Sequence, residues 1–148
     1  MSTPEHTPND QAERAKLIAL ARALRDLHKQ LIHVETQYFG AVGSPLELLQ
    51  LVTNHPHFAW LQKLSGLMAQ MDERLDEPET VTPEVATAYR SAIEELIGPS
   101  ETGDQAFRTK YNALLHDAPE IVMAHGNVRQ LLGAIAAPAR TQPSDKAG

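Results

Sequence analysis

The chain has 148 residues, of which 42% are hydrophobic and 22% charged, and its formal net charge is −6. This length predicts one domain, and a negative charge without a stripe of Lys or Arg argues against binding nucleic acid. The absence of cysteine excludes disulfides, thiol catalysis, iron–sulfur clusters and cysteine-based zinc sites. Residues 1–10 are polar, and no apolar run approaches the roughly 20 residues that span a bilayer. We therefore expect a cytoplasmic protein that binds no membrane.

A long first helix is predicted to begin within Thr7-Pro8-Asn9-Asp10 and to end at the glycines at 40 and 43. Thr7 is the expected N-cap and Pro8 the expected first helical residue, because proline lacks the N–H that would be unpaired there. Gly40 and Gly43 are expected to end the helix. Its apolar residues recur at steps of three and four, which places them on one stripe: Leu17, Leu20, Leu24, Leu27, Leu31, Val34 and Tyr38.

The strongest local signal follows in Ser44-Pro45-Leu46-Glu47. A serine followed three residues later by glutamate is typical of a capping box, in which each side chain accepts a backbone N–H of the first turn. A short helix is predicted from Pro45 to about Thr53. It must end before Pro56, because proline disfavours helical geometry in the residue before it. A further helix is predicted from about Pro56 to Leu75.

Three more helices are predicted beyond residue 80. Thr82-Pro83 begins the first, and Gly98-Pro99 ends it. Two further capping boxes, Thr102 with Gln105 and Asp117 with Glu120, predict where the other two begin.

No alternating strand pattern occurs in the sequence. The expected fold is therefore all-α, an irregular helical bundle of about five to six helices. We expect a flexible segment over residues 1–9, the helical domain over 10–137, and a disordered tail over 138–148, where apolar side chains are scarce.

Two parts of the sequence resemble a family of small, all-helical bacterial proteins that has no established activity. The first covers residues 43–76 and contains the blocks SPLELLQLVT, HPHFAWLQ and LMAQMDE. The second is the block ALLHDAPEIVMAHGNVRQLL. The resemblance implies a helical, cytoplasmic, bacterial protein and assigns no role to any residue.

The break between the second and third predicted helices is rich in histidine and aromatic side chains. His55-Pro56-His57-Phe58-Ala59-Trp60 contains two of the seven histidines and the only tryptophan. Such a break is either a packed corner or the edge of a site. Together with Met68, the residues His57, Phe58 and Trp60 could line an apolar pocket.

Three histidines fall on or beside the apolar stripes of three different predicted helices. His28 borders the first stripe, with Glu35 two turns further along, while His57 and His125 lie on the third and the last helix. Converging imidazoles could bind a metal or haem. Separate histidines, each hydrogen-bonded at the edge of the core, are the other interpretation. The spacing favours the second, because neither Glu-x-x-His nor His-Glu-x-x-His occurs.

No catalytic residue is predicted, since neither a Gly-x-Ser-x-Gly turn nor a glycine-rich phosphate loop occurs. We expect a non-enzymatic binding protein that needs no cofactor and binds a protein partner or a second copy of itself. Two alternatives stay open. In one, a metal or haem is held by His28, Glu35, His57 and His125. In the other, a small apolar ligand is sensed through the apolar pocket.

Overall fold

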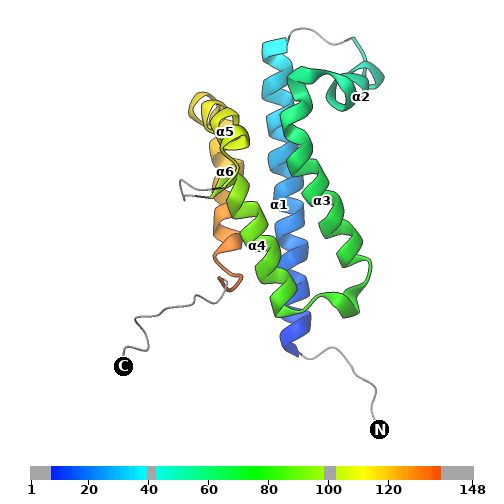
Figure 1. Ribbon diagram of the computed structural model, residues 1–148, viewed down its shortest axis with the longest axis vertical. Coiled ribbons are helices and arrows are strands. Elements are labelled where there is room, and N and C mark those ends of the chain that lie inside the picture. The colour runs from blue at the N-terminus through cyan, green and yellow to red at the C-terminus, as the bar shows by residue number, and fades with distance from the viewer. Residues whose placement is uncertain (1–7, 40–42, 99–102, 138–148) are drawn as a thin grey trace.

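The described structure is all-helical, with helices joined by short connections and without strands; it is a computed structural model that covers residues 8–39, 43–98 and 103–137 (Figure 1). The six α-helices are α1 (Pro8–Phe39), α2 (Pro45–Asn54), α3 (Gln62–Leu75), α4 (Pro83–Ile97), α5 (Gln105–Asp117) and α6 (Pro119–Leu132). Two short 3-10 helices, η1 (Pro56–Leu61) and η2 (Pro78–Thr80), join them. Over these residues the prediction of an all-α bundle is confirmed.

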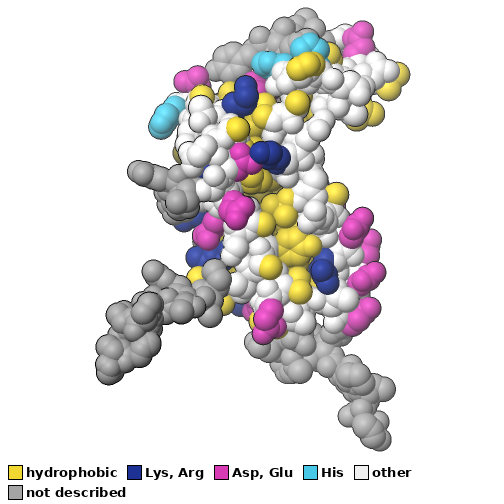
Figure 2. Space-filling model, viewed as in Figure 1, with side chains coloured by type: hydrophobic (Ala, Val, Ile, Leu, Met, Phe, Trp, Pro, Cys, Tyr) yellow, Lys and Arg dark blue, Asp and Glu magenta, His cyan; other side chains and the backbone are white. Residues whose placement is uncertain are grey.

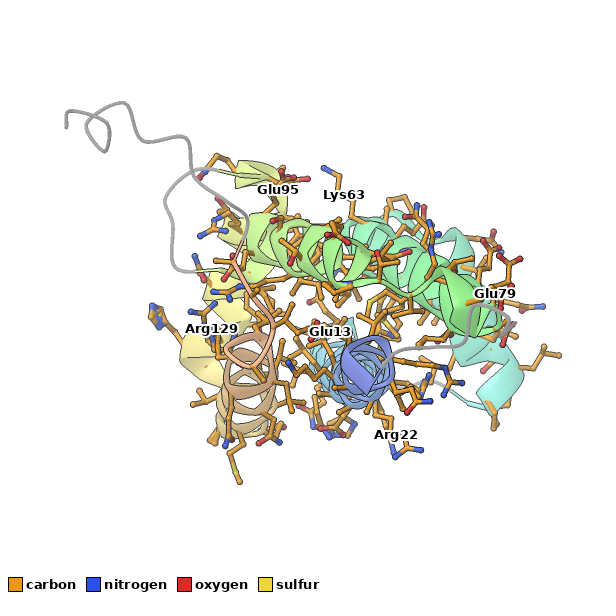
Figure 3. All side chains as sticks on the ribbon, turned by 90° about the horizontal axis from the view of Figure 1, so that it is seen from below. Glu13, Arg22, Lys63, Glu79, Glu95 and Arg129 are labelled. Atoms are coloured by element: carbon orange, nitrogen blue, oxygen red, sulfur yellow. The ribbon has the colours of Figure 1, made fainter. Side chains whose placement is uncertain are left out.

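Helix α1 is the spine of the bundle. Its 32 residues correspond to a length of about 48 Å, and α3, α4 and α6 all pack along it. Figure 3, seen from below, shows α3 and α4 in one layer with α1 against it and α6 beside α1. The predicted stripe faces this core: Leu17, Leu20, Leu24, Leu27 and Leu31 are all fully buried. Arg22 lies on the opposite, exposed side.

The termini of α1 meet the sequence predictions in part. Pro8 is the first helical residue, as predicted, so the helical domain begins at residue 8 and not at residue 10. The expected cap Thr7, the expected stop at Gly40 and the expected tail over 138–148 lie outside the described residues. None of the described helices is both long and apolar enough to cross a membrane.

The capping box of α2 forms with one difference from the expected pattern. The hydroxyl of Ser44 accepts the backbone N–H of Glu47 at 3.2 Å, as predicted. The carboxylate of Glu47 accepts the N–H of Gly43 at 2.7 Å, one residue before the cap. The helix begins at Pro45 and ends at Asn54.

We expect Ser44→Ala to destabilise α2 by about 0.5–2 kcal/mol and Ser44→Gly by only a few tenths. Helix α2 contributes no buried residue to the core, so the loss should appear as local opening before global unfolding. Amide hydrogen exchange within α2 measures it. Equal and negligible changes in both variants would show that the cap does not hold the helix.

The prediction of a single helix from Pro56 to Leu75 is wrong for its first six residues. These form η1, and α3 begins only at Gln62. The reason lies at His55, which is extended (φ −84°, ψ 135°) as the following proline requires. Its Nδ1 accepts the backbone N–H of His57 at 3.0 Å, so an imidazole takes the place of a serine or threonine cap.

Two predicted caps are also wrong. Helix α5 is capped by Asp104, whose carboxylate accepts the N–H of Phe107 at 3.0 Å, and not by Thr102, which lies outside the described residues. Gly103 has φ +107° and turns the chain into this cap. Asp117 still belongs to α5, because only Ala118 separates the two helices, and Ala118 caps α6 without a side-chain hydrogen bond.

The predicted ends of α4 are confirmed. Thr82 accepts the N–H of Val85 at 3.2 Å, and Gly98 follows the last helical residue. The sequence did not indicate the role of Arg108, which is 8% exposed. Its guanidinium donates to the carbonyls of Glu94 (3.0 Å) and Glu95 (3.3 Å) and also to that of Gly98. A charged donor from α5 therefore satisfies the carbonyls at the end of α4.

Candidate functional site

The predicted site residues from the histidine-rich break lie at one end of the bundle, where η1 packs between α1, α2, α3 and α5. A buried carboxylate organises part of this end. Glu35 of α1 is 7% exposed, and it accepts a hydrogen bond from Trp60 Nε1 at 2.6 Å. The Nε2 atom of His57 lies 3.3 Å from the Glu35 carboxylate and 3.3 Å from its backbone oxygen. These contacts fix η1 against α1.

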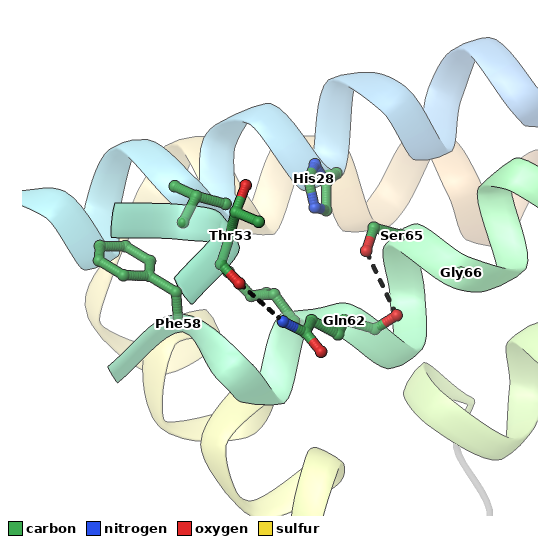
Figure 4. Close-up of a pocket in the computed structure, with 8 residues that line it drawn as sticks. His28, Thr53, Phe58, Gln62, Ser65 and Gly66 are labelled. Carbon is green, nitrogen blue, oxygen red and sulfur yellow. Dashed lines mark hydrogen bonds between the residues drawn. The ribbon is translucent and has the colours of Figure 1, made fainter. Parts of the chain in front are cut away.

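A cavity of about 450 Å³ lies beside η1, between α1, α2 and α3. Figure 4 shows His28 pointing from α1 toward the space between Thr53 and Ser65. Gln62 donates to the carbonyl of Thr53 at 3.2 Å and so connects the end of α2 to the start of α3. The lining residues are His28, Val52, Thr53, Phe58, Leu61, Gln62, Ser65 and Gly66.

A row of rings runs from η1 into α5 and α6. The Trp60 ring lies 4.9 Å from Phe107, and Phe107 lies 6.0 Å from Tyr111, centroid to centroid. At the end of the row, the Tyr111 hydroxyl lies 2.7 Å from His125 Nδ1. Burial raises the pKa of Tyr111, so at neutral pH its hydroxyl keeps its proton and forms a neutral hydrogen bond with the imidazole.

Two histidines are held in their neutral form. Burial lowers the pKa of His28. Burial, with a smaller contribution from the positive charge of Arg129, lowers the pKa of His125. Both imidazoles are therefore uncharged at neutral pH and act as neutral hydrogen-bonding groups.

These lowered pKa values predict that acid destabilises the fold. At pH values below the ordinary histidine pKa of about 6.5, His28 and His125 bind protons in the unfolded chain but remain unprotonated in the folded one. The free energy of unfolding should therefore fall as the pH drops below about 6.5, until the lowered folded pKa values are passed. Urea unfolding between about pH 7.5 and 5.5 measures the slope, which His28→Gln and His125→Gln should each reduce. A slope unchanged by either substitution would contradict the assignment.

The structure separates the residues of the expected pocket. Phe58 is fully buried and lines the cavity. His57 and Trp60 turn toward Glu35 instead, and the partly buried Met68 packs against the core.

The expected metal ligands are also separated, except for Glu35 and His57. His28 lines the cavity, while His125 is paired with Tyr111. Over residues 8–39, 43–98 and 103–137, no group of three or more His, Asp or Glu side chains could hold a metal ion.

The sequence did not indicate which apolar side chains stay outside the core. In the described part of the chain, the exposed large hydrophobic residues form two pairs: Leu46 (64%) and Leu49 (62%) on α2, and Val122 (51%) and Met123 (73%) on α6. Figure 2 shows hydrophobic atoms on the surface at the α2 end of the molecule. Helix α2 is unusual because none of its residues is buried.

Comparison with known proteins does not assign this chain to a family. No family model, no curated protein and no solved structure matches the chain.

Proposed function

We propose that this chain is a non-enzymatic, cytoplasmic binding module that acts through the outer face of α2, and that its partner there is a second copy of the same chain. The observation that carries the proposal is the exposure of Leu46 and Leu49. They lie three residues apart, hence on one face of the helix, and are 64% and 62% exposed. Exposed apolar patches are typical of interaction sites when their side chains lie together, and these two leucines form a small patch of this kind.

The charge of α2 supports a second copy as the partner. Glu47 is the only charged residue of the helix, and its carboxylate accepts the N–H of Gly43. Two α2 helices can therefore meet antiparallel about a two-fold axis, with each Leu46 near the partner's Leu49, without bringing several like charges together.

The small size of the patch predicts a weak contact. A stable interface buries about 800 Å² on each partner, and a helix of ten residues with two exposed leucines offers less. We therefore expect a reversible dimer that forms only at high protein concentration.

Sedimentation velocity over a wide range of protein concentrations tests this proposal. The wild type should shift from monomer to dimer, and the double variant Leu46→Ser/Leu49→Ser should stay monomeric. The double variant Val122→Ser/Met123→Ser is the matched control, because it removes the other exposed apolar pair, and it should dimerise like the wild type. A monomeric wild type, or equal loss in both variants, would refute the proposal.

Binding of metal or haem is not proposed. The candidate ligands are held in three separate environments, and three of them, Glu35, His57 and His125, already have hydrogen-bond partners within the chain.

A further inference from the structure

The cavity beside η1 has the size of a small-molecule binding site. It lies apart from the exposed leucines on the outer face of α2. Its volume of about 450 Å³ falls within the range of about 300–1,000 Å³ typical of small-molecule sites. Phe58 (0% exposed) and Leu61 (1%) contribute its most buried walls. Val52 adds a third apolar side chain, from α2.

The lining carries no formal charge. None of its eight residues is Asp, Glu, Lys or Arg. The imidazole of His28 is neutral at neutral pH, because burial lowers its pKa. A charged ligand would lose its hydration here without gaining a counter-charge, so the cavity favours an uncharged one.

The polar groups of the lining differ in what they offer a ligand. Gln62 donates to the carbonyl of Thr53, and the hydroxyl of Ser65 donates to the carbonyl of Gln62 at 3.2 Å. Among the described residues, no hydrogen bond is formed by the ring of His28, which points into the cavity (Figure 4). A neutral imidazole has one donor and one acceptor, so it can bind a hydroxyl, amine or amide of a ligand.

We propose that this cavity binds a small, uncharged, mainly apolar molecule that carries one hydrogen-bonding group, and that His28 contacts this group. The apolar part of the ligand lies against the half-buried Val52, and the buried Phe58 and Leu61 form the floor behind it. The ligand enters beside Gly66, where the wall has no side chain: a Cβ atom built there would meet no atom within 4 Å. This site is separate from the outer leucines of α2, so its test does not depend on dimer formation.

The uncharged fluorophore N-phenyl-1-naphthylamine is a suitable probe, because its emission rises in apolar surroundings. We expect saturable binding of one molecule per chain. Gly66→Phe adds a bulky ring to the lining of the cavity and should weaken this binding at least about tenfold. Gly126→Phe is the matched control: Gly126 also lies inside a helix with no atom within 4 Å of a built Cβ, but on α6 and outside the cavity. It should bind the probe like the wild type.

Circular dichroism is the control that tests whether both variants keep their helices. If Gly66→Phe loses helix, Gly66→Leu is used in its place. Absence of saturable binding to the wild type, or equal binding by the Gly66 variant and the Gly126 variant, would overturn the proposal.

The role of His28 is tested with two ligands that differ by one hydroxyl. Displacement of the probe gives the affinities of 1-naphthol and naphthalene for the wild type and for His28→Leu. Loss of one hydrogen bond should weaken 1-naphthol about fivefold more than naphthalene. Equal changes for both ligands would show that His28 does not contact the polar group.

Discussion

Replacing Phe107 by alanine is expected to lower the free energy of unfolding by about 3–5 kcal/mol. The side chain is 1% exposed, and its ring lies between those of Trp60 and Tyr111. Its removal leaves a cavity where α5 meets η1 and also removes two aromatic contacts. Urea unfolding measures the loss.

The exposed Met123→Ala is the control for this substitution and should change the stability by no more than about 0.5 kcal/mol. A loss below about 1 kcal/mol for Phe107→Ala would contradict the packing described for this row of rings.

Replacing Glu35 by alanine is expected to cost about 2–3 kcal/mol, because it leaves the N–H of Trp60 without its charged acceptor. Glu35→Gln keeps an acceptor oxygen and should cost less, about 1 kcal/mol. Trp60 is the only tryptophan, so its fluorescence reports this environment directly and should change more in the alanine variant.

A double-mutant cycle separates this hydrogen bond from other effects of the substitution. Trp60→Phe removes the N–H, so Glu35→Ala should cost less in that background, with a coupling energy above about 0.5 kcal/mol. Strictly additive losses would show that the carboxylate and the indole do not interact.

The helices could be predicted from the sequence where a local pattern determines them. The stripe from Leu17 to Leu31 predicted the buried face of α1, and Ser44 and Thr82 correctly marked the starts of α2 and α4. Each of these signals depends on residues that are neighbours along the chain, and tertiary packing did not override them.

The two capping errors arose where the residue that caps the helix is not the one that matches the sequence pattern. Thr102 and Asp104 both stand before α5, and the positive φ of Gly103 accompanies the choice of Asp104. Asp117 matches a capping pattern, but it also continues α5, and the single-residue connection at Ala118 leaves it inside that helix.

The candidate site could be predicted only as a region. The sequence indicated that the segment around His57 forms a corner or the edge of a site, but not that Glu35 would bind Trp60, 25 residues away. The pairing of His125 with Tyr111 likewise depends on how α5 packs against α6. Such pairs depend on three-dimensional packing, so a helical period can place a histidine on an inner face without revealing its partner.

A dilution series of ¹H–¹⁵N correlation spectra shows directly whether two copies of this chain bind each other through the outer face of α2, as we propose. Amides that sense the contact should shift with protein concentration, and we expect these shifts to be concentrated in α2 around Leu46 and Leu49. They should disappear in the Leu46→Ser/Leu49→Ser variant. Shifts centred on Met123 of α6, or spectra that do not change with concentration, would contradict the claim.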